Sequence, residues 1–190
     1  MLHRDGSRGA LRSALDPDPQ PALGAGDRLA AVMVPLIETQ APAVVFTVRA
    51  GRLSRHAGEI SFPGGLQDPG ETLAETAERE AREEIGLFGA EILGSLPAVH
   101  TFVSAILMVP FVAALDDAPR FVVNEGEIDR VLTFPLADLA RAEGTVEYPR
   151  EGGRVWRGWA YPMDEDTIWG ATGMVLHSLL QVVRMETSWL

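Results

Sequence analysis

The segment GLQDPGETLAETAEREAREEIGL, residues 65–87, contains the signals that decide the fold. Asp68-Pro69-Gly70 is typical of a turn, and Thr72 followed by Glu75 is the pattern of a capping box. These signals predict a helix that begins near Leu73. Gly86 is a natural stop for that helix, because glycine readily adopts the left-handed conformation that ends helices.

Three carboxylates share one side of this predicted helix. At about 100° per residue, Glu80, Glu83 and Glu84 fall within an arc that borders the apolar face. Like charges at this spacing repel one another, and partial burial removes their hydration, so a positive ion is expected beside them. Oxygen ligands without nearby His or Cys suit Mg²⁺ or Mn²⁺ and indicate phosphoryl chemistry. The alternative is a charged, solvated surface helix.

The same segment resembles the Nudix box, G-x5-E-x7-R-E-U-x-E-E-x-G-U, where U is a bulky aliphatic residue. Every fixed position matches, and only Ala81 is smaller than the pattern asks. This favours the catalytic interpretation over the solvated helix. The resemblance to Nudix hydrolases implies an α/β fold, an α/β/α sandwich with a mixed β-sheet. It also implies metal-dependent hydrolysis of a nucleoside diphosphate linked to another moiety.

The resemblance assigns a metal site to the box. Glu80 and Glu84, one helical turn apart, correspond to metal-binding glutamates, and Glu83 to a further ligand, directly or through water. Gly64 or Gly65 is positioned to offer a backbone carbonyl, because glycine permits close approach. The implied ion is Mg²⁺ or Mn²⁺.

Further catalytic roles follow from the same resemblance. Arg79 would orient the neighbouring carboxylates through ion pairs, and Glu71 would brace the loop. The box does not specify the general base. Glu127, just before a predicted strand, is the first choice and Glu83 the second. Glu125 and Glu127 have the alternative interpretation of two acids in an exposed turn.

Residues 46–65, FTVRAGRLSRHAGEISFPGG, resemble the signature that precedes the box in the coenzyme A diphosphatase branch. Residues 152–179 resemble the closing segment of that branch. This implies hydrolysis of coenzyme A or its derivatives to 3′,5′-ADP and 4′-phosphopantetheine, or its acylated form. Arg49, Arg55 and His56 are the expected substrate-binding residues, since arginine pairs bidentately with phosphate. A solvated loop is the alternative for the two arginines, and for His56 the alternative is a histidine that fixes the loop by hydrogen bonding.

Two other functions stay open. One is a Nudix hydrolase of a different nucleoside diphosphate derivative, such as ADP-ribose, a dinucleoside polyphosphate or an oxidised nucleotide. The other is a non-catalytic module that binds a nucleotide. Trp156, Trp159 and Trp169 could stack on adenine, but aromatic residues at alternate strand positions are more often core, and a core role is expected.

Composition sets the remaining limits. The chain has 190 residues, with 27 acidic residues against 16 basic ones and a net charge of −11. That charge opposes non-specific binding to nucleic acid or to an anionic membrane surface. The chain contains no cysteine, so disulfides and thiolate metal sites are excluded. A cytoplasmic location is expected, and the sequence does not indicate an oligomeric state.

Turn-forming composition predicts a flexible or loosely docked arm over residues 1–27, followed by one domain over 28–186. Apolar periodicity predicts strands and helices within that domain. The expected strands are 30–37, 43–49, 91–96, 106–115, 131–134 and 155–161, with helices 135–141 and 171–185 besides the box helix.

Overall fold

The computed structural model describes residues 2–51, 58–101, 105–149 and 155–190. Eight strands form the main sheet: β1 (Arg28–Ile37), β2 (Ala43–Arg49), β3 (Ile60–Ser61), β4 (Gly64–Leu66), β5 (Glu91–Ser95), β6 (Val99–His100), β7 (Ile106–Leu115) and β8 (Ile128–Pro135). The sheet is mixed, because β1 and β7 pair in parallel along their whole length while β2, β4, β5, β6 and β8 join as antiparallel partners.

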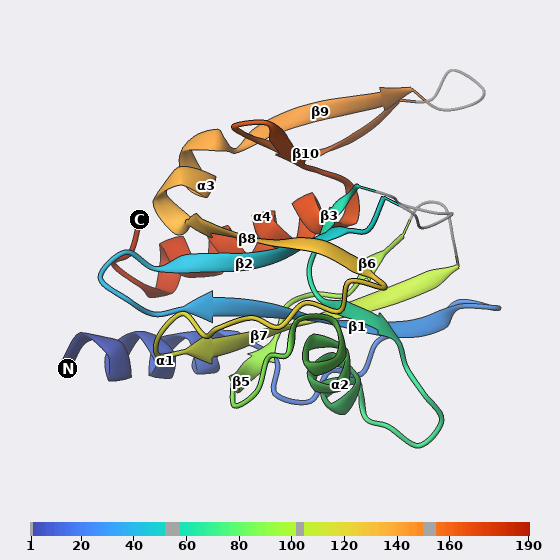
Figure 1. Ribbon diagram of the computed structural model, residues 1–190, viewed down its shortest axis with the longest axis horizontal. Coiled ribbons are helices and arrows are strands. Elements are labelled where there is room, and N and C mark those ends of the chain that lie inside the picture. The colour runs from blue at the N-terminus through green and yellow to red at the C-terminus, as the bar shows by residue number, and fades with distance from the viewer. Residues whose placement is uncertain (1, 52–57, 102–104, 150–154) are drawn as a thin grey trace.

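Three further strands form a small antiparallel sheet, β9 (Gly144–Pro149), β10 (Val155–Met163) and β11 (Asp166–Ile168). The helices are α1 (Leu2–Ala14), α2 (Leu73–Ile85), α3 (Leu136–Ala142) and α4 (Gly170–Glu186). Figure 1 shows α2 below the central strands, with α3 and the β9–β10 hairpin above them. In the part of the chain that the structure describes, no helix is long and apolar enough to span a bilayer.

The central strands separate two apolar cores. Along β1, Val32 and Val34 belong to the core shared with α4, whereas Ala31 and Met33 belong to the core shared with α2. This alternation follows from the two-residue period of a strand, which sends successive side chains to opposite faces. The predicted α/β/α sandwich with a mixed sheet is therefore confirmed.

The longer predicted elements occur close to their expected bounds. The box helix begins at Leu73 as predicted, and β1, β2, β5, β7, β8, β10, α3 and α4 cover the other expected segments. The short strands β3, β4, β6, β9 and β11 were not predicted. Each gains its strand conformation from pairing with a long neighbour, as β4 does from β1, and such pairing leaves little local signal.

The expectation of a flexible or loosely docked arm over residues 1–27 requires correction for residues 2–15. Residues 2–14 form α1, and Leu11 and Leu15 lie buried in the main core. Arg8 forms ion pairs with Glu38 and Glu91. Leu11 and Leu15 lie one helical turn apart and anchor α1, whereas the turn-forming composition is concentrated in residues 16–27.

Candidate active site

The capping signals at both ends of α2 act as predicted. The Thr72 hydroxyl accepts a hydrogen bond from Glu75 N at 3.2 Å, and the Glu75 carboxylate accepts one from Thr72 N at 2.7 Å. Gly86 ends the helix with a φ of 64°. The caps fix where α2 begins and ends. Ala77, Ala81 and Ile85 fill its buried face and so set its rotation against the sheet.

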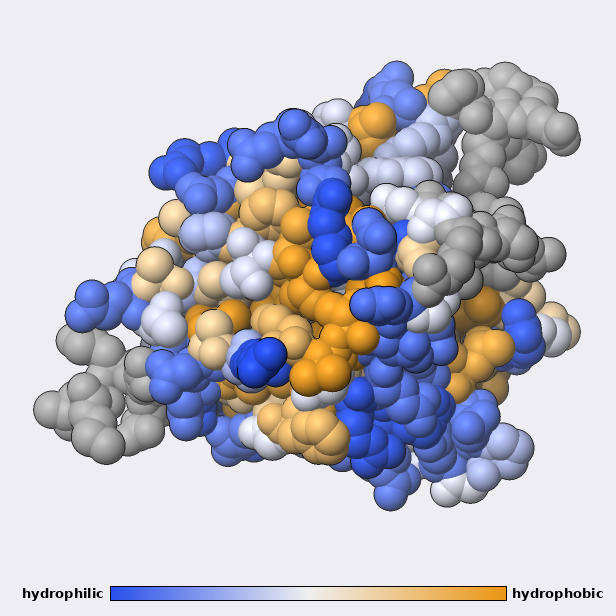
Figure 2. All heavy atoms as spheres, viewed as in Figure 1, coloured by the Kyte–Doolittle hydropathy of each residue, from blue (hydrophilic) through white to orange (hydrophobic). Residues whose placement is uncertain are grey.

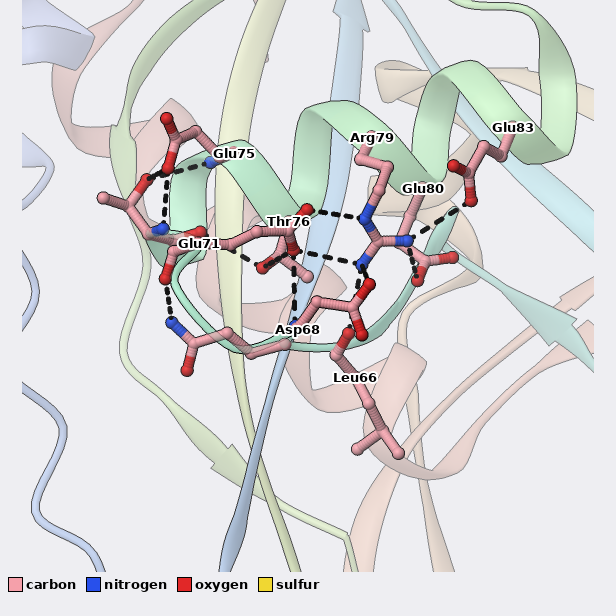
Figure 3. Close-up of polar contacts among 10 residues, drawn as sticks. Leu66, Asp68, Glu71, Glu75, Thr76, Arg79, Glu80 and Glu83 are labelled. Atoms are coloured by element: carbon pink, nitrogen blue, oxygen red, sulfur yellow. Dashed lines mark hydrogen bonds and ion pairs between the residues drawn. The ribbon is translucent and has the colours of Figure 1, made fainter.

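Arg79 gathers the carboxylates of the box, as Figure 3 shows. Its Nε donates to Glu71 Oε1 at 2.7 Å, and its Nη1 lies 2.8 Å from Glu80 Oε1 and 3.3 Å from Glu83 Oε2. The hydrogen bond from Arg79 holds the pKa of Glu71 down to about 2. Arg79 Nη2 also donates to the Leu66 carbonyl at 3.2 Å. One guanidinium thus connects the loop before α2 to Glu80 and Glu83. Together with Glu84, these two residues form the acidic stripe of α2.

Glu84 is the most buried acid of the stripe, with 2% of its surface exposed. Gly64 N donates to its Oε2 at 3.3 Å, and Arg49 Nη1 lies 3.9 Å from its Oε1. Burial, followed by the negative charge of Glu80, raises the pKa of Glu84 to about 8, and Glu127 adds to this rise. Glu84 is therefore a carboxylate that these contacts neutralise only in part.

Backbone hydrogen bonds hold the loop that carries Glu127 against the end of α2 and the residue that follows β2. Asn124 N donates to the Glu84 carbonyl at the end of α2 at 2.8 Å, and Ala50 N donates to the Glu127 carbonyl at 2.8 Å. The charge of Glu127 also raises the pKa of Glu80, although burial is the main cause of that rise. The loop before β8 therefore adds a second acid, besides Glu80, to the field around Glu84.

The donor chemistry of this cluster fits Mg²⁺ or Mn²⁺. Its side-chain donors are carboxylate oxygens, and a cation beside Glu84 would relieve the repulsion that raises its pKa. Across the described ranges, no three Asp, Glu, His or Cys side chains are arranged to hold an ion as they stand. Glu80 and Glu83 instead pair with the Arg79 guanidinium.

A cleft of about 440 Å³ adjoins the acids. Arg49, Gly64 and Gly65 line it next to α2, and Tyr148, Trp156 and Trp169 line it from the small sheet and the start of α4. Figure 2 shows hydrophilic side chains gathered over α2, with apolar side chains exposed beside them. The cleft thus offers a charged region and an aromatic region within one cavity.

The tryptophans divide between cleft and core. Trp159 stacks on His177, with ring centroids 3.8 Å apart, and packs against the main core, in agreement with the expected core role. For Trp156 and Trp169 that expectation was wrong, because both line the cleft and Trp169 is 43% exposed. The position of Trp169 immediately before α4, outside strand alternation, was the available signal.

The structure brings most of the predicted site residues together. Arg79 contacts Glu80, Gly64 in the cleft wall contacts Glu84, and Arg49 also faces Glu84. The Glu83 side chain is 53% exposed and contacts Arg79. The predicted substrate-binding residues Arg55 and His56 lie outside the described residues.

Comparisons with known proteins agree with the box. Residues 27–151 match the NUDIX domain family. "Uncharacterized Nudix hydrolase NudL" of Pectobacterium atrosepticum is 33% identical over 159 residues, which cover 80% of this chain and 81% of that protein.

Solved structures share the fold. A MutT/nudix family protein from Enterococcus faecalis superposes with a TM-score of 0.57 at 17% identity. The superposition covers 88% of this chain and 66% of that one. The NUDIX domain of Shewanella oneidensis NrtR, solved with ADP ribose, superposes with a TM-score of 0.55 at 17% identity, covering 84% of this chain and 88% of that one.

Proposed function

Because this chain belongs to the Nudix hydrolase family, we propose that it hydrolyses the diphosphate linkage of coenzyme A or its derivatives. The products would be 3′,5′-ADP and 4′-phosphopantetheine, or acyl-phosphopantetheine from an acylated substrate. Family membership by itself supports a pyrophosphohydrolase that acts on nucleoside diphosphate derivatives. Coenzyme A as the substrate and the cytoplasm as the location of the enzyme are our proposals.

One observation carries this choice. The cleft that contains Arg49 and Gly64 beside Glu84 continues to Tyr148, Trp156 and Trp169 without leaving the same cavity. Such a cavity suits a diphosphate that carries a long, largely uncharged extension on one side. Coenzyme A has this form, and residues 46–65 resemble the signature of the coenzyme A diphosphatase branch.

The positively charged Arg49 side chain at the cleft supports binding of phosphate. The Arg49 guanidinium lies 3.9 Å from Glu84 with 30% of its side chain exposed, so it can contact a ligand in the cleft while facing the acids. A planar guanidinium presents a fixed fork of N–H donors that matches two phosphate oxygens at once. We assign substrate binding to Arg49 and, on the resemblance, to Arg55 and His56.

The acidic stripe would hold the metal. Glu80 and Glu84 are the proposed ligands, Glu83 a further one, and the Gly64 carbonyl an additional donor. When bound, Mg²⁺ or Mn²⁺ would supply positive charge to offset the charge that develops on the phosphate oxygens. Arg79 would orient the carboxylates through the ion pairs that it makes with Glu80 and Glu83.

Hydrolysis also requires a base. The oxygen of a water molecule bonds to one phosphorus while the bridging phosphorus–oxygen bond breaks, and the proton of the water must be taken up. Glu127 is our first choice, because its charge acts on Glu80 and Glu84 from the loop before β8. Glu83 is the second choice, since more than half of its side chain is exposed.

The direct test is incubation with coenzyme A and either Mg²⁺ or Mn²⁺, followed by mass spectrometry of the products. We expect 3′,5′-ADP and 4′-phosphopantetheine only when the metal is present. Dephospho-coenzyme A, ADP-ribose and a dinucleoside polyphosphate serve as competing substrates, compared by kcat/KM. No cleavage of coenzyme A with either metal would overturn the substrate assignment, and cleavage of ADP-ribose alone would select another Nudix activity.

A binding module without turnover makes a different prediction. Such a protein would bind the nucleotide but release no product under any metal condition. Turnover by the wild type that is lost in Glu84→Gln, with circular dichroism unchanged, would exclude that alternative.

A further inference from the structure

The aromatic residues of the cleft form a compact cluster. Tyr148 and Trp156 have ring centroids 5.2 Å apart at an interplanar angle of 32°, and Tyr148 and Trp169 have centroids 5.7 Å apart at 35°. Rings at these separations contact each other, so neither of these pairs leaves a slot into which a flat base could insert. The cluster therefore presents an aromatic wall to the cleft.

The hydroxyl groups along the cleft are already used within the protein. Thr101 Oγ1 donates to a backbone carbonyl at 3.3 Å and Thr172 Oγ1 to another at 3.1 Å, while Ser61 Oγ lies 3.0 Å from Thr47 Oγ1. A purine presents donors and acceptors along its edge and loses affinity when these stay unpaired. The lining hydroxyls offer few partners for such an edge.

Apart from Glu59, carbon forms most of the remaining wall. The apolar lining residues are Ala30, Val32, Ile60, Phe62, Leu66, Ile106, Met108 and Ala171. Among the described residues that line the cleft, Arg49 is the one cation, and it faces Glu84 beside α2. Charged phosphates are therefore favoured beside Arg49, and an uncharged chain along the carbon wall.

We propose that Tyr148, Trp156 and Trp169 form the subsite for the uncharged arm of the substrate, the pantetheine chain with any acyl group attached to it, and not for its adenine. This rests on the proposed function. The subsite makes acylated substrates bind more tightly than free coenzyme A, because each added methylene removes apolar surface from water. The aromatic wall thus determines which derivatives the enzyme prefers.

The kinetic test compares octanoyl-coenzyme A and coenzyme A in the wild type and in Trp169→Ala. Trp169 is 43% exposed, so the fold should tolerate its loss. We expect KM for octanoyl-coenzyme A to rise about tenfold, KM for coenzyme A to rise less, and kcat to hold. Phe88→Ala removes another exposed aromatic side chain, outside the cleft lining, and should change neither KM.

Inhibition by 3′,5′-ADP distinguishes the two ends of the substrate. Under the proposal, its inhibition constant changes less than about twofold in Trp169→Ala, since its adenine does not use the wall. A rise in that constant equal to the rise in KM would overturn the assignment and place adenine on the wall. Equal KM values for the two substrates in the wild type would also overturn it.

A binding measurement separates this subsite from the proposed activity. Octanoyl-4′-phosphopantetheine and 3′,5′-ADP are titrated separately into metal-free protein while tryptophan fluorescence is recorded. Saturable quenching by the first ligand that weakens in Trp169→Ala supports the subsite even if coenzyme A is not cleaved. If octanoyl-4′-phosphopantetheine causes no quenching, or if 3′,5′-ADP quenches with a lower dissociation constant, the subsite assignment is overturned even if coenzyme A is cleaved.

Discussion

Glu84 and Glu143 are two largely buried carboxylates on opposite sides of the main sheet, and their surroundings differ. Glu84 lies among Glu80 and Glu127, with Arg49 3.9 Å away, and its pKa is raised to about 8 by burial and by the charge of Glu80. Glu143 lies at the end of α3 among groups that donate hydrogen bonds to it.

The partners of Glu143 outweigh its burial. Tyr161 Oη and His177 Nδ1 each lie 2.9 Å from Glu143 Oε1, and Arg184 Nη2 lies 2.8 Å from Oε2. Burial alone would raise the pKa of Glu143, but these hydrogen bonds hold it below its ordinary value. A carboxylate satisfied by its own protein ties elements together, whereas one crowded by like charges is suited to a cation from outside.

The largest expected effect is a loss of turnover when Glu84, a proposed metal ligand, is replaced. Replacing it as Glu84→Gln keeps the shape but removes the charge, and we expect kcat to fall at least about 100-fold with Mg²⁺ or Mn²⁺, because losing even an outer partner of a metal ligand costs about 10- to 100-fold. Steady-state assays measure this. Glu78→Gln, on the exposed side of the same helix, is the matched control and should keep its activity. A loss of only a few-fold in Glu84→Gln would remove Glu84 from the metal site.

The pH dependence of the metal-free protein should show the strain at Glu84. Because the folded pKa of Glu84 is raised from 4.5 to about 8, the folded state binds more protons than the unfolded state between these values, so stability falls as pH rises. Urea unfolding should show the stability of Glu84→Gln relative to the wild type rising as pH increases from 5 to 8, by up to about 4 kcal/mol at about 1.4 kcal/mol per pKa unit. Adding Mn²⁺ should stabilise the wild type more than the variant. An unchanged difference on adding Mn²⁺ would contradict metal binding there.

Glu143→Gln should have the opposite profile. Because the folded pKa of Glu143 is lowered, its contribution to stability is present above the unfolded pKa near 4.5 and is lost as pH falls through the lower folded value. We expect a loss of about 1–2 kcal/mol at pH 7, with kcat unchanged. Asp138→Asn breaks an exposed ion pair of the same helix and should cost less than about 0.5 kcal/mol. Equal losses in both variants would end the contrast with Glu84.

The smallest expected effect is at Gly65 in β4, the short strand that faces α2. A Cβ on Gly65 would lie 2.3 Å from Glu80 Oε1, so Gly65→Ala must push that carboxylate aside. We expect kcat/KM to fall about tenfold with little change in the melting temperature, since the end of a flexible side chain yields more readily than backbone. Gly144→Ala meets only an ordinary contact at 3.7 Å and is the control. Unchanged kcat/KM in Gly65→Ala would separate the position of Glu80 from catalysis.

The sequence was most informative where the structure depends on close neighbours along the chain. The capping box of Thr72 and Glu75, the stop at Gly86 and the shared face of Glu80 and Glu84 all depend on residues within about one helical turn of each other. The long strands were also predictable. Their apolar runs in the sequence are typical of strands buried within a sheet.

Features that depend on distant segments were not predictable in this way. The docking of α1 through Leu11 depends on a core built from strands and helices far along the chain, and the exposure of Trp169 depends on how the small sheet meets the main one.

The sequence by itself determined that the acids of α2 lie on one side of a helix, because helical geometry is set by local hydrogen bonds and caps. Only the tertiary structure decided that Glu84 is buried beside Gly64, that Glu127 joins it, and that the same cleft continues to an aromatic wall. The reason is physical: burial and the electric field at a side chain are sums over all groups nearby in space, most of which are distant in sequence.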